Sequence, residues 1–357
     1  MDEKGNILDY TLESINEYTI QSAHRLVDLL IDEGIATKKQ QDKESKLFIG
    51  NMTDKSGLKY CLKNFDMALK SVEKWEIQKN YRYSMLFDYS GFSEDRLQGL
   101  IEENYIICYN ELEGFEELYP IIQKPSLIKE TNSYVLKFNL GLSATDAFDN
   151  KLKKRYTILV LFYLNEKMLE IRFDSISAQF SRDKLKLIHG VIVWLEKFLQ
   201  LDVQAIDLKD IVDYMKKDCQ EEQVVLAGQD MLMATGAKAT IDIGKSDDQV
   251  LPFIGELKDI MCEYEEEFQN APEIRAALNN FIYEKENLSE FPWVKLKFEE
   301  KSIEVKFTFD YGEENGCLIQ HFHNALKSNQ GRERMDYVTN YVIKVRSIIT
   351  KLPTEQE

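Results

Sequence analysis

The clearest catalytic pattern in the chain is Glu304-Val305-Lys306, a Glu-x-Lys within a segment that alternates apolar and polar residues. Alternation of this kind predicts a strand, and a strand places Glu304 and Lys306 on one face. In metal-dependent nucleases, carboxylates hold a divalent cation and a lysine helps to orient the attacking water. With Glu290 as a further acid, the pattern defines one hypothesis, a divalent-metal-dependent nuclease or hydrolase.

The alternation around this motif also has a simpler interpretation. Lys295, Lys297 and Glu299 repeat the same polar spacing. Lys and Glu that alternate with Val, Ile and Phe are typical of the solvated face of an antiparallel sheet. We therefore favour an ordinary surface hairpin and keep the hydrolase as the alternative.

His321 and His323 form an H-x-H whose imidazoles would share one face of a strand and could share a metal ion. The chain has four histidines in all, and the spacing does not identify a third ligand. Two histidines that only donate or accept hydrogen bonds are the plainer interpretation. Because GxxxxGK[ST] and GxGxxG motifs are also absent, we expect neither a metal nor a cofactor.

Two acidic runs are interleaved with apolar and aromatic residues. The first includes Glu111, Glu113, Phe115, Glu116 and Glu117, and the second is Glu263, Tyr264, Glu265, Glu266, Glu267 and Phe268. Carboxylates around aromatic anchors suit docking to a basic protein. The competing interpretation is the solvated side of two helices.

The overall charge supports a basic partner and argues against nucleic acid. The 357 residues include 45 basic and 62 acidic residues, a formal charge of −17, which disfavours general nucleic-acid binding. The longest apolar run, 156–164, is too short for a membrane helix. Five cysteines without a CxxC predict reduced thiols and a cytoplasmic location.

The order of the expected elements predicts an α+β fold in which antiparallel hairpins and meanders pack against amphipathic helices. We expect helices over 13–33 and 58–75, a meander over 134–176, and a hairpin over 293–309. Composition shifts divide the chain into three expected domains: a helix-rich α+β domain over 1–128, a meander with helices over 129–222, and a connector with a C-terminal α+β domain over 223–357.

Two hairpins in this scheme resemble each other. Residues 165–173 read NEKMLEIRF and residues 299–307 read EEKSIEVKF, and a helical pattern follows each. An internal duplication of a hairpin-plus-helix unit is one explanation. The other is that any exposed hairpin shows charged turn residues followed by alternation.

Taken together, the sequence favours an acidic, cytoplasmic, non-enzymatic interaction protein of a regulatory, inhibitory or immunity and defence type. We expect its partner to be another protein with a basic surface, and self-association into a homo-oligomer stays open. The Glu304-x-Lys306 hydrolase is the competing hypothesis.

Overall fold

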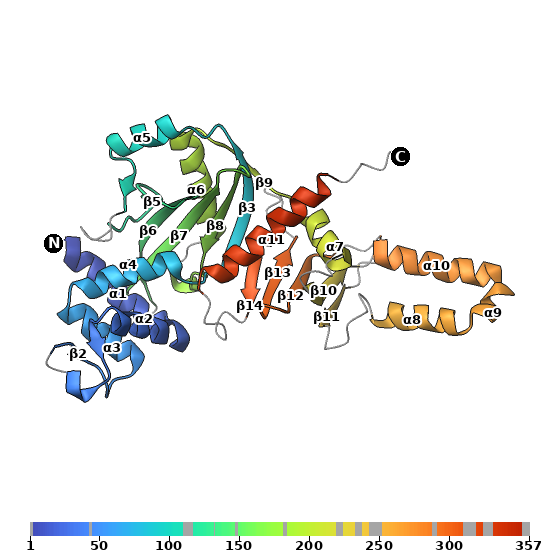
Figure 1. Ribbon diagram of the computed structural model, residues 1–357, viewed down its shortest axis with the longest axis horizontal. Helices are drawn as coiled ribbons and strands as arrows, with labels where there is room; N and C mark the ends of the chain where they lie inside the picture. Colours follow the sequence, from blue (N-terminus) through green and yellow to red (C-terminus); the bar gives the residue numbers. More distant parts are fainter. Residues whose placement is uncertain are drawn as a thin grey trace. The chain divides into compact units, whose positions relative to one another are not determined.

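The computed structural model shows an α+β protein whose strands are mostly antiparallel. It describes residues 3–42, 45–109, 117–131, 133–146, 149–180, 184–218, 224–232, 238–242, 252–287, 291–309, 319–323 and 331–351. The chain forms two compact units, which Figure 1 colours along the sequence. Unit 1 is Met1–Gln204 with Ala325–Tyr337, and unit 2 is Ala205–Asn324 with Val338–Glu357.

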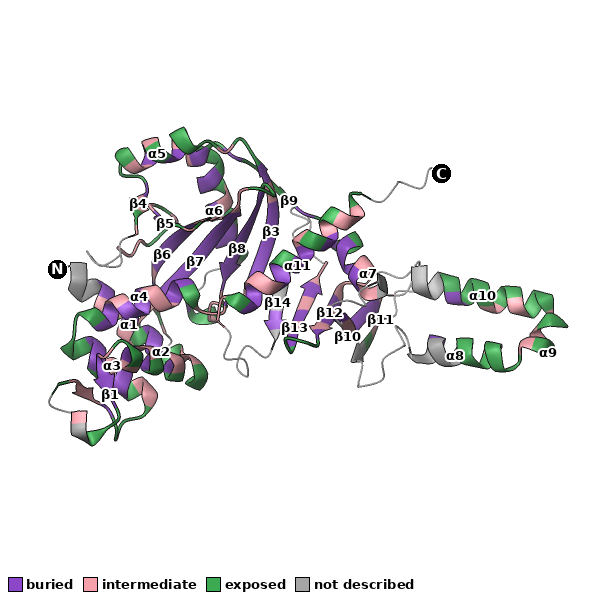
Figure 2. Cartoon of the chain, viewed as in Figure 1, coloured by how far each residue is buried: buried purple, intermediate pink, exposed green. Residues whose placement is uncertain are grey.

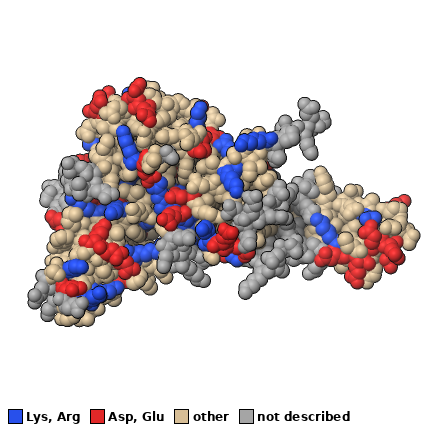
Figure 3. Space-filling model, viewed as in Figure 1, with Lys and Arg blue, Asp and Glu red and all other residues tan. Residues whose placement is uncertain are grey.

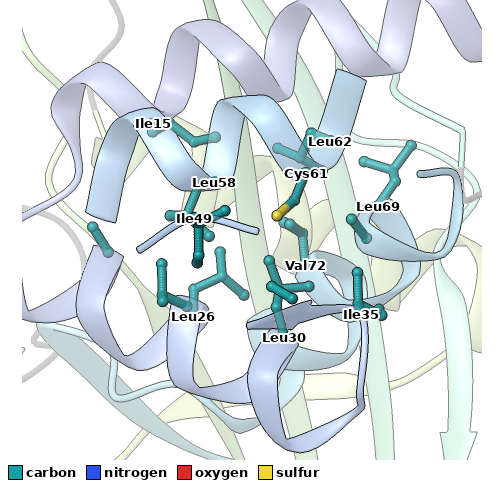
Figure 4. Packing of buried hydrophobic residues seen from close by; sticks show 14 of the residues in the cluster. Ile15, Leu26, Leu30, Ile35, Ile49, Leu58, Cys61, Leu62, Leu69 and Val72 are labelled. Carbon is teal, nitrogen blue, oxygen red and sulfur yellow. The ribbon is translucent and has the colours of Figure 1, made fainter. Parts of the chain in front are cut away.

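Unit 1 begins with a helical cluster. Its helices are α1 (Glu3–Glu17), α2 (Ile20–Asp32), α3 (Asp54–Asn64) and α4 (Met67–Gln78), with a 3-10 turn (Gln40–Asp42) and the paired strands β1 (Ala36–Thr37) and β2 (Leu47–Phe48). Side chains from all four helices form one core, part of which Figure 4 shows around Leu30, Leu58 and Val72. Burial of these apolar faces stabilises helices that would be marginal alone.

The two long helices expected over 13–33 and 58–75 are wrong, because each segment forms two helices. Between α1 and α2, Thr19 adopts extended backbone and its hydroxyl accepts a hydrogen bond from the Ser22 amide, just as Thr53 caps the start of α3 through the Ser56 amide. Such N-caps begin new helices. The expected helix 58–75 breaks where Phe65 is extended, at φ −148° and ψ 114°.

The sheet of unit 1 is built on the expected meander, which the structure confirms. Its strands are β3 (Tyr83–Ser90), β4 (Ile107–Cys108), β5 (Ser126–Lys129), β6 (Ser133–Thr145), β7 (Lys151–Tyr163) and β8 (Met168–Phe173), in the order β3-β8-β7-β6-β5-β4. Only β4 and β5 are parallel among these pairs. The remaining elements are α5 (Glu94–Glu102), a 3-10 turn (Ala178–Phe180), α6 (Lys184–Trp194), a π-helical turn (Leu195–Leu199) and β9 (Asp202–Ala205), which pairs with β3.

Unit 2 has its own antiparallel strands, in the order β11-β10-β12-β13-β14. Its elements are α7 (Lys209–Asp218), β10 (Val224–Leu232), β11 (Lys238–Asp242), α8 (Pro252–Glu263), α9 (Glu265–Gln269), α10 (Pro272–Asn287), β12 (Trp293–Phe298), β13 (Ile303–Thr308), β14 (Ile319–His323) and the part of α11 (Glu333–Ile349) that begins at Val338. Buried and half-buried residues alternate along β12 and β13. The buried face packs on α11, where the rings of Phe298 and Tyr341 lie 5.5 Å apart.

The two compact units differ from the three domains expected from composition. The expected boundary at 128/129 falls inside β5, which pairs with β6, and β3 pairs with β8 across the same boundary. Long-range strand pairing joins these segments, and composition carries no signal for it. Over the part of the chain that the structure describes, no helix is both long and apolar enough to cross a membrane.

The internal duplication stays a prediction. The turns β7–β8 and β12–β13 have the same length, and each ends on a residue with positive φ, Lys167 at 52° and Ser302 at 52°. After these turns the two segments differ, because α6 follows β8 without another strand whereas β14 precedes α11. The shared turn geometry is also what any hairpin of this length adopts.

Candidate functional site

The second acidic run lies at the end of a helical hairpin in unit 2, formed by α8, α9 and α10 and called the arm below (Figure 1). At its base, Ile254 of α8 and Ile282 of α10 belong to one buried cluster with Met231 of β10. At its tip, Glu265 of α9 lies 2.9 Å from Arg275 of α10. Because the start of α8 meets the end of α10, the two helices run antiparallel.

The sequence of the arm explains its shape. Pro252 and Pro272 are the first residues of α8 and α10, a position where proline's fixed φ and missing N–H cost nothing. Between the helices, the amide of Asn270 donates to the carbonyls that end α9. The inner faces carry residues at spacings of three and four, namely Ile254, Leu257 and Met261 on α8 and Arg275, Leu278 and Ile282 on α10.

The tip of the arm carries a concentration of negative charge. Glu263, Glu266 and Glu267 are exposed, whereas Glu265 is half-buried beside Arg275. Figure 3 shows acidic side chains gathered over this end of the arm. The 36 residues of 252–287 include nine acidic and three basic residues, a net charge of −6. This field attracts a basic surface.

The arm also exposes large apolar side chains. The exposed fractions are 48% for Ile260, 48% for Tyr264, 57% for Ile274, 42% for Phe281 and 61% for Tyr283. Figure 2 shows that most of the arm is exposed, in contrast to the buried strands of the sheets. Apolar side chains gathered on one exposed element are typical of an interaction surface.

Sequence reasoning found only part of this surface. It named Tyr264, which is exposed, and Phe268, which is half-buried. It did not name Ile260, Ile274 or Phe281, which lie outside the acidic run that drew attention to this segment. One sequence pattern could have indicated these three residues, because each directly precedes a residue of the inner face of its helix.

The first acidic run lies largely outside the described residues, which omit Glu111, Glu113, Phe115 and Glu116. Glu117 is described, and its carboxylate accepts a hydrogen bond from the Tyr119 hydroxyl in unit 1. The use of this run as a binding surface stays a prediction.

Two of the hydrolase residues lie on β13, an inner strand of the unit 2 sheet that pairs with both β12 and β14. Glu304 and Lys306 are half-buried on β13, where the register places Glu304 opposite His323 and Lys306 opposite His321. Directly opposite residues share a sheet face. The side chains of His321 and His323 lie outside the described residues, as does Glu290.

The β12 residues opposite Glu304 and Lys306 are both lysines. On β12, Lys297 lies opposite Glu304 and Lys295 lies opposite Lys306. The Lys306 ammonium lies 3.9 Å from the centroid of the Trp293 ring, a cation–π contact. The Lys297 ammonium is paired with Glu299 at 2.8 Å, so this face of the sheet carries alternating acids and bases, as a solvated sheet face does. In the described ranges, no three His, Cys, Asp or Glu side chains are grouped to hold a metal ion.

A cluster of charges that sequence reasoning missed lies inside unit 1, between α4 and the sheet. Glu76 accepts hydrogen bonds from Arg155 at 2.8 and 2.7 Å and lies 3.1 Å from the Lys137 ammonium, and all three side chains are buried. Burial alone would raise the pKa of Glu76, but the Arg155 and Lys137 charges outweigh it and lower the pKa to about 2. The acid is therefore ionised and paired in the interior, where it ties α4 to β6 and β7.

Comparison with known proteins gives no relative: neither a family model nor a curated protein matches the chain.

Proposed function

We propose that this protein is an acidic interaction protein, a regulatory, inhibitory or defence-type subunit, that binds a basic surface of another protein through the arm. The observation that supports the proposal is the coincidence of exposed apolar side chains with an acidic tip on one element. Apolar anchors supply most of the affinity of an interface, whereas charge supplies association rate and specificity. The arm carries both.

The first test removes charge from the tip without changing its shape. The triple variant E263Q/E266Q/E267Q keeps good helix formers and spares Glu265, which binds Arg275. The matched control is D95N/E102Q/E103Q, which removes three exposed acids at α5 of unit 1. The partner is first captured from the native host and then purified, so that its binding to each variant is measured directly.

Association rates measured from 0.05 to 0.5 M salt decide the outcome. The triple variant should associate roughly three- to tenfold more slowly at low salt and lose most of its salt dependence, since steering depends on charge at the docking site. The α5 control should match the wild type. Equal rates for all three proteins would contradict docking at the arm.

The hydrolase is retained as a second candidate because of one observation, the register that sets Glu304 and Lys306 opposite the two histidine positions of β14. It predicts a Mg²⁺- or Mn²⁺-dependent cleavage by the purified protein. Glu304→Gln would abolish that activity, and the arm triple variant would leave it intact.

We also propose a cytoplasmic site of action. The described cysteines, Cys61, Cys108 and Cys262, are free thiols, which suits a reducing compartment.

A further inference from the structure

The exposed apolar side chains of the arm follow a regular pattern along its two helices. On α10, Ile274 and Phe281 are seven residues apart, which is two helical turns. On the other side of the hairpin, Ile260 lies on α8 and Tyr264, four residues later, directly follows α8, and the Tyr264 amide donates to the Ile260 carbonyl at 3.0 Å, which continues the helical path. Both spacings place the members of a pair on one side of the helical path. These four residues are called the apolar strip below.

The apolar strip occupies one face of the arm. Each member directly precedes a residue turned toward the opposite side of the hairpin, in the pairs Ile260 and Met261, Tyr264 and Glu265, Ile274 and Arg275, and Phe281 and Ile282. One residue is a rotation of about 100° around a helix. Two antiparallel helices that face each other are related by a two-fold axis perpendicular to the plane that contains both helices. The residue that precedes an inner-face residue therefore lies on the same face of the hairpin in both helices.

The strip also has a defined length. Phe281 lies at the base beside Ile282, and Ile274 lies at the tip beside Arg275. Their separation along the axis is about 10 Å, from a rise of 1.5 Å per residue. Ile260 follows Ile254 of the base by six residues, so it lies between these ends on the neighbouring helix.

We infer that the arm binds an amphipathic, basic α-helix of its partner along the apolar strip, an inference that rests on the proposed function. Anchors at the base, middle and tip over about 10 Å match apolar residues at i, i+3 or i+4, and i+7 of a helix. The acidic tip matches Lys and Arg on the same helix. A second copy of this chain fits poorly, because it would bring two arms of net charge −6 together.

The probe is a fluorescent synthetic 18-residue peptide of Leu and Lys, with Leu at helical spacing on one face. A second peptide has the same composition but distributes its Leu residues around the helix. Both have the same charge, so a difference in their affinity for the full-length protein reports the apolar face alone. Fluorescence anisotropy should give the amphipathic peptide at least about tenfold tighter binding.

The strip is tested with I260S/F281S, and the matched control is C262S/Y283S. The two control residues are exposed and directly follow Met261 and Ile282, so they lie on the opposite face of the arm. The strip variant should lose about tenfold or more in affinity for the amphipathic peptide, and the control should stay within about twofold. Circular dichroism checks that both variants are folded.

The outcomes separate this inference from the proposed function. If the strip variant binds the amphipathic peptide as the wild type does, or if both peptides bind equally, the inference is wrong even where the tip variant still slows association with the partner. Sedimentation that shows a wild-type dimer, broken by I260S/F281S, would assign the strip to a second copy and would equally overturn the inference. Loss of peptide binding in the strip variant alone supports it.

Discussion

Replacing Glu76 by Gln should be among the most damaging single changes in unit 1. Glu76 is 3% exposed. Its carboxylate accepts two hydrogen bonds from the Arg155 guanidinium and also forms an ion pair with the Lys137 ammonium. Lys137 also donates to the Glu73 carbonyl at 3.2 Å. Gln keeps the size of the side chain but leaves two cations in the interior without this counter-charge.

Two independent routes give the magnitude. Removing one partner of a buried ion pair costs about 3 to 5 kcal/mol in other proteins. The pKa of Glu76 falls from 4.5 to about 2 on folding, and at about 1.4 kcal/mol per unit this corresponds to about 3 kcal/mol. The two routes agree, so we expect the free energy of unfolding of unit 1 to fall by about 3 kcal/mol or more and its melting temperature to fall by about 10 °C.

Urea denaturation followed by tryptophan fluorescence measures this change. Unit 1 contains Trp75 and Trp194, and unit 2 contains Trp293, so a W293F background limits the signal to unit 1. The control is Glu17→Gln, which breaks the 2.5 Å pair with Lys154, where the Glu17 side chain is 38% exposed. Partly exposed pairs contribute about 1 kcal/mol or less. A Glu76→Gln loss no larger than the Glu17→Gln loss would refute the buried-charge argument.

The dependence on pH gives a second check on the same residue. Because folding lowers the pKa of Glu76 from 4.5 to about 2, its stabilisation is complete above pH 4.5 and disappears as the pH falls toward 2. The stability difference between wild type and Glu76→Gln should therefore shrink across this window. A difference that stays constant down to pH 2 would show that the loss has another cause.

Two further predictions concern the helical cluster and the thiols. Leu30→Ala in the fully buried core should reduce the free energy of unfolding by about 2 to 5 kcal/mol, measured by urea denaturation, and a loss below about 1 kcal/mol would contradict the packing in Figure 4. In native protein, a thiol reagent should modify the exposed Cys108 and Cys262 quickly and Cys61 slowly, because Cys61 is buried and burial raises its pKa to about 11. Equal rates at Cys61 and Cys108 would contradict this assignment.

Local patterns predicted the strands of the meander and of the β12–β13 hairpin well, whereas β10 and β11 lie where a connector was expected and the helix ends were predicted less well. The meander β6–β7–β8 and the hairpin β12–β13 were predictable because alternation and turn residues lie within a few positions of each other. The breaks at Thr19 and Phe65 were missed because apolar spacing continues through them, while the decisive feature is the conformation of one residue. Strand pairs distant in sequence, such as β3 with β8, leave no local signal and were not predictable.

The candidate site was also only partly predictable, because local patterns show its charge but not how its helices pack. Charge runs are visible in a sequence, so the acidic tip at Glu263–Glu267 was identified directly. The apolar strip depends on how two helices face each other, which the spacing within one helix does not define. The buried cluster around Glu76 had one weak signal, Lys137 between the apolar residues Leu136 and Phe138, but its acid lies far away in sequence on α4.

The arm and the helical cluster of unit 1 differ in how many apolar side chains they bury, and this difference explains why the arm is suited to binding. Its buried cluster at the base consists of Met231, Ile254 and Ile282, with Leu257, Met261 and Phe291 partly buried around it, whereas the helical cluster of unit 1 has a far larger core. An element with few buried apolar contacts opens locally at low cost. A partner helix on the apolar strip would cover side chains that the arm itself leaves exposed. Because such a partner binds only the formed hairpin, it would also stabilise the arm, so binding and arm stability are linked.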